Sequence, residues 1–115
     1  MKFIILTLLT AQSAFAQLTP VQVEQFAQAI YRVEGGAKTS YPFGVKSINT
    51  GGDYAKAKRI TIISINNNYS RWEKSGKKIS FVKFMALRWC PPSADPIGHK
   101  NWVNNMEKLV KFEIK

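Results

Sequence analysis

Four segments of this chain carry apolar residues at helical spacing, and three of them end at a strong helix breaker. The first segment opens at residues 19–22 with a hydroxyl N-cap, a proline at the first helical position and a glutamine placed to complete a capping box. Its apolar pattern stops at the glycine pair 35–36. Because the start signal, the apolar spacing and the stop signal agree, we predict a helix over residues 20–34.

The second segment, residues 53–74, carries signals for both a strand and a helix. Residues 59–65 are rich in β-branched side chains, which favour strands. Four apolar or aromatic side chains nevertheless share one face at helical spacing, namely Ile62, Ile65, Tyr69 and Trp72. We predict a helix, because burial of that face outweighs a cost of roughly a few tenths of a kcal/mol per β-branched residue.

Two further helices and one loop complete the expected domain. The third helix spans about residues 80–89, and the proline pair 91–92 forbids its continuation. A loop over 93–100 then precedes a fourth amphipathic helix. The apolar residues of that helix are Trp102, Val103, Met106, Leu109 and Val110. Glycine-rich residues 37–52 predict an ordered loop, or a short β element, after the first helix, so the chain is expected to be mainly α with about four helices.

Residues 1–16 have the pattern of a secretory signal peptide. A charge at Lys2 is followed by an apolar run over 3–9 and a small-x-small end at 14–16. The run is too short to span a membrane as a helix. We therefore expect an exported protein, periplasmic or secreted, with a single domain over 17–115.

The chain is strongly cationic, with 17 Lys and Arg against 7 Asp and Glu in 115 residues. Exported cations of this size are expected to bind anionic wall polymers, lipid headgroups, acidic proteins or extracellular nucleic acid. No recognised nucleic-acid motif is present, so we expect no nucleic-acid partner. The single cysteine, Cys90, is interpreted as a buried thiol, and the single histidine, His99, provides neither a metal site nor a triad. No metal and no cofactor are therefore expected.

Glu34 interrupts the amphipathic pattern of the first helix. At 100° per residue its side chain falls about 20° from Val23 and Ala27 and about 40° from Ile30, inside the apolar stripe. The helix dipole also disfavours a negative charge in the last turn, by roughly 0.3–1 kcal/mol. Partial desolvation within the apolar stripe and the helix dipole both disfavour the ionised carboxyl. They therefore raise its pKa and make it a usable general acid. The alternative is a hydrated Glu34 at a frayed helix end, with Gly35 as an ordinary left-handed cap.

Residues 29–36, Ala-Ile-Tyr-Arg-Val-Glu-Gly-Gly, followed by 44–48, Gly-Val-Lys-Ser-Ile, resemble the lytic transglycosylase and goose-type lysozyme group. In that group a helix ends in Glu followed by Ser or Gly, and a Gly-hydrophobic-x-Gln-hydrophobic turn comes shortly afterwards. Segments 66–72, 88–96 and 101–105 are similar to a small exported branch with a lysozyme-like core.

The resemblance implies a lysozyme-like fold, a glycan cleft between the first helix and the following loop, and Glu34 as the catalytic acid. Gly35 matches the small residue after the Glu, Gly44 the turn glycine, and Ser47 the place of the usual Gln. Ser47 therefore lacks the amide that would help to hold the sugar. The Ala-Tyr-Asn-x-Gly segment of many transglycosylases has no clear counterpart.

The expected activity is cleavage of the bond between N-acetylmuramic acid and N-acetylglucosamine in peptidoglycan, by hydrolysis or with formation of an anhydro product. Glycosidases normally use two carboxylates. Asp53 is interpreted as a helix N-cap and Asp95 as a turn residue, so a mechanism with Glu34 alone is favoured. An inactive module that binds wall glycan or an assembly partner is the alternative, and a cationic surface binder without a cleft is a third.

Side chains that could hold the glycan form the rest of the predicted site. Tyr41, Phe43, Tyr69 and Trp72 offer sugar-stacking faces, with core packing as the alternative, favoured for Trp72. Asn67 and Asn68 offer amides to the acetamido groups. The complete set predicted to bind substrate is Gly35, Tyr41, Phe43, Gly44, Ser47, Asn67 and Tyr69. We expect a monomer whose partners are peptidoglycan strands, with proteins of a secretion machine or of wall assembly as further candidates.

Overall fold

Four α-helices account for most of the chain in the computed structural model, which describes residues 18–46 and 50–115. The helices are α2 (Pro20–Val33), α3 (Tyr54–Lys74), α4 (Phe81–Trp89) and α5 (Pro96–Leu109). Two 3₁₀ turns, η1 (Gly36–Lys38) and η2 (Pro42–Gly44), lie between α2 and α3, and this described part of the chain holds no strand. The mainly α prediction is confirmed. The predicted signal peptide at 1–16 lies outside the described residues.

Helix α2 begins and ends where its local signals predict. The Thr19 hydroxyl accepts a hydrogen bond from the N–H of Gln22 at 3.1 Å, and the Gln22 side chain accepts one from the N–H of Thr19 at 2.9 Å. These two bonds form the complete capping box. At the other end Glu34 is the C-cap, and Gly35 has φ +112°, a left-handed conformation that glycine adopts without steric cost.

Residues 53–74, which carried both strand and helix signals, form α3, the longest helix of the described residues. Asp53 caps it, since its carboxylate accepts the N–H of Lys56 at 3.1 Å. Two buried polar side chains on its inner face bond to carbonyls of the same helix: Thr61 Oγ1 to Ala57 at 2.8 Å, and Asn68 Nδ2 to Ser64 at 2.8 Å. Their polar groups are satisfied inside the helix, so the whole face can be buried.

Helix α5 starts earlier than predicted: the expectation of a loop over 93–100 is confirmed for 93–95 and wrong for 96–100, which are helical. Asp95 is the N-cap of α5, its carboxylate accepting the N–H of Gly98 at 2.9 Å, and Pro96 is the first helical residue. An acidic cap followed by proline at the first position is a helix start signal. The interpretation of Asp95 as a turn residue overlooked that signal.

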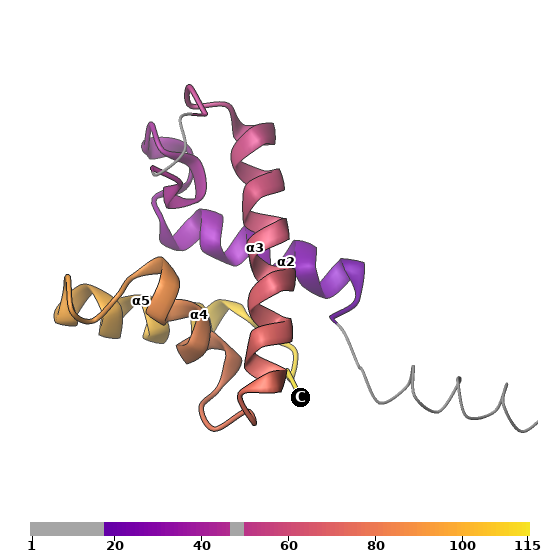
Figure 1. The fold of residues 1–115 in the computed structure, drawn as a ribbon. Coiled ribbons are helices and arrows are strands. Elements are labelled where there is room, and N and C mark those ends of the chain that lie inside the picture. The colour runs from indigo at the N-terminus through magenta and orange to yellow at the C-terminus, as the bar shows by residue number, and fades with distance from the viewer. Residues whose placement is uncertain (1–17, 47–49) are drawn as a thin grey trace, which may run out of the picture.

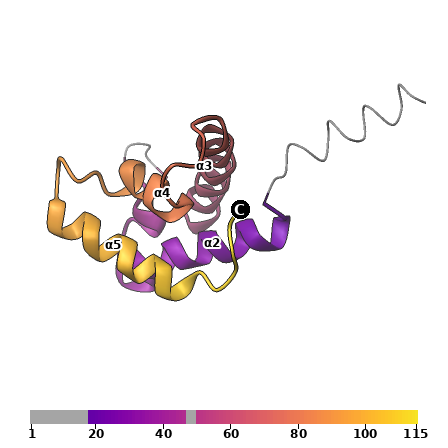
Figure 2. The same cartoon turned by 90° about the horizontal axis from the view of Figure 1, so that it is seen from below.

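The helices enclose one core between α2 and the other three. Figure 1 shows α3 crossing α2, and Figure 2 shows α5 lying alongside α2, while α4 packs against both α3 and α5. In the middle of this core, the ring centroids of Phe26 and Phe81 lie 5.2 Å apart. The largest fully buried apolar side chains are Phe26, Ile30, Phe43, Ile65, Phe81, Met85 and Met106. The loop that follows α2 lies beside the N-terminal half of α3 (Figure 1).

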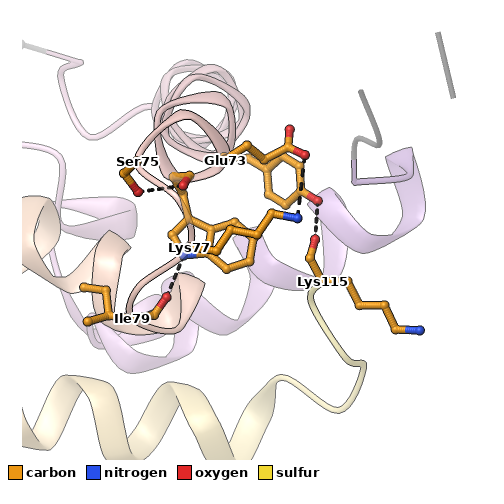
Figure 3. A network of polar contacts seen from close by, with 7 residues as sticks. Glu73, Ser75, Lys77, Ile79 and Lys115 are labelled. Carbon is orange, nitrogen blue, oxygen red and sulfur yellow. Dashed lines mark hydrogen bonds and ion pairs between the residues drawn. The ribbon is translucent and has the colours of Figure 1, made fainter. Parts of the chain in front are cut away.

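Tyr69 and Trp72 belong to the core and tie distant segments to the end of α3. The Tyr69 hydroxyl donates to the carbonyl of Lys115 at 2.8 Å, and Trp72 Nε1 donates to the carbonyl of Ile79 at 2.7 Å (Figure 3). Both rings are at least 95% buried. The prediction that Tyr69 binds sugar is therefore corrected, because its ring packs inward and its hydroxyl holds the C-terminal segment.

Candidate active site

The Glu34 carboxyl is held by a tryptophan from a different helix. Trp102 Nε1, on α5, donates to Glu34 Oε2 at 2.9 Å, and the indole is 96% buried. The backbone of Glu34 is fixed as well, since its N–H donates to the carbonyl of Ile30 at 2.9 Å. The side chain is partly buried rather than free at a frayed helix end. This arrangement fixes the position of one carboxylate oxygen and leaves the other available.

Gly44 packs directly against this carboxyl. A Cβ atom on Gly44 would lie 2.7 Å from both Cδ and Oε1 of Glu34, closer than van der Waals contact allows. Its φ of +70° also disfavours any residue with a side chain. Only glycine fits this position, so the turn glycine and the glutamate of the resemblance meet in space.

Phe43 anchors the loop that carries Gly44. Its ring is fully buried between Tyr31 and Tyr54, with ring centroids 5.1 and 5.3 Å away, and Trp89 Nε1 donates to its carbonyl at 2.8 Å. Phe43 has φ +60°, a left-handed conformation that costs about 1–3 kcal/mol and persists only where the surroundings impose it. Phe43 was predicted to bind sugar, and this expectation is corrected: its ring is a core anchor.

Burial is the largest influence on the pKa of Glu34 and raises it above the ordinary value. The hydrogen bond from Trp102 and the positive charge of Lys46 act in the opposite direction, because both favour the ionised form. The direction agrees with the expectation from the helical wheel. Burial also raises the pKa of the Cys90 thiol, with smaller contributions from the charges of Asp95 and Glu34, so this half-buried thiol is a poor nucleophile.

A groove of about 490 Å³ runs between the Gly44 loop, α3 and the end of α4. Its lining consists of residues 44–46, of Ile60, Ile63, Ser64, Asn67, Asn68 and Arg71 on α3, and of Arg88 and Trp89 on α4. Gly44 both lines the groove and contacts the Glu34 carboxyl, whereas Glu34 itself is not among the lining residues. Three cations and no acidic residue are among these lining residues.

The remaining predicted residues are distributed around the site. Asn67 lines the groove, as does Asn68, whose amide is already bonded to Ser64. Tyr41 is half-exposed and lines a second depression, with the Lys46 ammonium 5.4 Å from its ring centre. Gly35 follows Glu34, the C-cap of α2, and precedes η1. Ser47 lies outside the described residues.

Four functional candidates were missed by the sequence reasoning. Trp102 was assigned to an amphipathic helix face, and Trp89, Arg71 and Arg88 were not singled out as functional residues. The signal for Trp102 was present, since a tryptophan whose N–H is buried needs a hydrogen-bond acceptor. Its partner could not be identified, because Glu34 lies 68 residues away.

The two aspartates that the sequence offers as a second carboxylate both have structural roles. Asp53 and Asp95 are both engaged as helix N-caps.

Among residues 18–46 and 50–115, no group of three or more His, Cys, Asp or Glu side chains is placed to hold a metal ion. No helix in those two ranges is long and apolar enough to cross a membrane.

Comparisons of the chain with protein-family models, with curated proteins and with solved structures gave no match. The resemblance to the transglycosylase group therefore stays a prediction made from the residues.

Proposed function

We propose that this chain is an exported peptidoglycan-cleaving enzyme, of lytic transglycosylase or lysozyme type, with Glu34 as its catalytic acid. The observation that supports this proposal is the Glu34 carboxyl itself: burial raises its pKa, Trp102 fixes one of its oxygens, and Gly44, which contacts it, also lines a groove. A carboxyl whose pKa is raised by burial, and which lies close to a groove, is suited to protonate a glycosidic oxygen.

The hydrogen bond from Trp102 decides which oxygen carries the proton. An indole N–H only donates, so Oε2 must accept, and the proton of the neutral acid resides on Oε1. Oε1 is the oxygen that faces Gly44. The acidic proton is therefore presented toward Gly44, which also lines the groove.

The reaction begins when Glu34 gives this proton to the oxygen that bridges N-acetylmuramic acid and N-acetylglucosamine. The C1–O bond breaks, and the positive charge that develops at C1 is stabilised by the acetamido group of the substrate. In the transglycosylase route, the Glu34 carboxylate takes the proton of the muramyl C6 hydroxyl, whose oxygen bonds to C1 and forms a 1,6-anhydro ring. In the lysozyme route a water molecule takes the place of this hydroxyl.

The sacculus-digestion assay tests this proposal with Glu34→Gln. The amide keeps the shape of the side chain and an acceptor for Trp102, but it has no proton to give, so we expect release of muropeptides to be abolished. Folding and sacculus binding are expected to persist. Glu107→Gln, an exposed substitution on α5, is the matched control and should release muropeptides normally. Undiminished release by Glu34→Gln would remove Glu34 from the mechanism.

Mass spectrometry of the products separates the two routes, since an anhydro product lacks the water that hydrolysis adds.

A glycan-binding module without cleavage is the second candidate, and one observation favours it: Glu34 itself is not among the residues that line the groove. Wild-type protein that binds sacculi and releases nothing would establish this second function.

A further inference from the structure

Cationic side chains from three different elements converge on the groove. Lys46 comes from the loop after η2, Arg71 from the last turn of α3, and Arg88 from the last turn of α4. The described residues that line the groove include no Asp or Glu. The side chains that line the groove therefore carry three positive charges and no negative one, which favours an anionic ligand.

The two guanidinium groups have no partner within the described part of the protein. Its hydrogen bonds and ion pairs involve neither side chain, whereas Lys58 and Lys77 each pair with a glutamate. Each arginine therefore offers planar N–H donors to a ligand, in a geometry that matches a carboxylate. The groove also has apolar walls at Ile60, Ile63 and Trp89, against which the apolar face of a sugar ring can pack.

We propose that Arg71 and Arg88 bind carboxylate groups carried by the muramyl units of the glycan, and so seat the strand beside Glu34. This inference rests on the proposed function for the identity of the ligand. Two sources supply the same chemistry: the lactyl carboxylate of a strand whose peptides have been removed, and the carboxylates of the attached stem peptides. Lys46 adds positive charge at the Gly44 end of the groove.

Binding is measured with the Glu34→Gln chain, so that no cleavage takes place during titration. The probes are solubilised glycan strands with stem peptides, strands freed of peptides by an amidase, the freed strands after methyl esterification, and a neutral N-acetylglucosamine hexamer. We expect one of the first two probes to bind at least tenfold more tightly than the esterified strands and the hexamer. The tighter of those two probes identifies the source of the carboxylate.

Arg71→Gln and Arg88→Gln, each added to this chain, are expected to weaken binding of the preferred probe about tenfold and to leave binding of the esterified strands unchanged. Arg59→Gln is the matched control, because it removes the same charge from an exposed position on α3 outside the groove. It should change affinity less than twofold. Circular dichroism confirms that each variant is folded.

Equal binding of carboxylate and esterified strands would overturn the proposal, as would an equal loss with Arg59→Gln. Arginine substitutions without effect would overturn it too. Because affinity is measured without cleavage, these results leave the enzymatic proposal to the sacculus assay. Conversely, arginine-dependent binding by a wild-type chain that releases no muropeptides would overturn the enzyme and keep the carboxylate site.

Discussion

Two residues, Gly44 and Trp102, hold the Glu34 carboxyl in place, and replacing either one is expected to change its position. Gly44 leaves the space that the carboxyl occupies, and Trp102 supplies the hydrogen bond that orients it. Neither Gly44 nor Trp102 gives or takes a proton in the proposed reaction. Substitutions at these two positions therefore test positioning, whereas Glu34→Gln tests the proton.

Gly44→Ala is expected to reduce muropeptide release by about 100-fold, because the new Cβ would displace the carboxyl by roughly an ångström. The left-handed backbone adds a stability loss of about 1–2 kcal/mol. Gly76→Ala is the matched control: it has φ +90° and nothing within 4 Å of the added Cβ. It should lose comparable stability in urea unfolding and keep full activity. Equal activity of the two variants would contradict the close contact.

Trp102→Phe removes the N–H that favours the ionised form of Glu34, so the pKa of Glu34 rises further. The acid then stays protonated to higher pH, and we expect the alkaline limb of the pH–activity profile to move upward. The size of the maximum is expected to fall, since the carboxyl is no longer oriented. The control is Trp72→Phe, which removes an equally buried indole whose N–H bonds to Ile79.

Trp72→Phe should lower stability without moving the pH profile. An unchanged profile in Trp102→Phe would show that the indole only fills space in the core.

The helices are held at their ends by side chains close to them in sequence. Each helix has an N-cap side chain that accepts a hydrogen bond from a backbone N–H of the first turn. These N-caps are Thr19, Asp53, Ser80 and Asp95. Such caps were predictable for α2 and α3, because the signal lies within four residues. The start of α5 was assigned to a loop, although Asp95-Pro96 carries a signal of the same kind.

Asp95→Ala removes the N-cap of α5 and is expected to lower the free energy of unfolding by about 0.5–2 kcal/mol. Asp95→Asn, which keeps an acceptor oxygen, should retain most of that stability. Urea unfolding followed by circular dichroism measures both values. Equal loss in the two variants would mean that the carboxylate charge, not the capping bond, stabilises the helix.

For the molecule as a whole, α3 joins the groove to the C-terminal segment. Its groove-lining residues extend from Ile60 to Arg71, whereas Tyr69, which does not line the groove, bonds to Lys115 (Figures 1 and 3). The contact between Tyr69 and Lys115 joins residues 46 positions apart. This contact is structural, and a substitution there is expected to leave the groove intact.

Tyr69→Phe deletes that hydroxyl and is expected to cost about 0.5–1.5 kcal/mol of stability, because one hydrogen bond is lost while the ring is kept. Muropeptide release at a temperature where both proteins are folded should equal that of the wild type. A reduced affinity for glycan strands in Tyr69→Phe would instead restore Tyr69 to the substrate site.

Local signals predicted the four helices, apart from the start of α5, and the unusual position of Glu34, because helical spacing, caps and breakers act over a few neighbouring residues. The surroundings of that carboxyl depend instead on contacts between segments far apart in the chain. Trp102 comes from the far end of the chain, and Phe43 and Tyr69 turn inward although their aromatic rings suit a sugar equally well. Which face of a helix meets a distant segment depends on how all the helices pack together, and no local pattern contains that information.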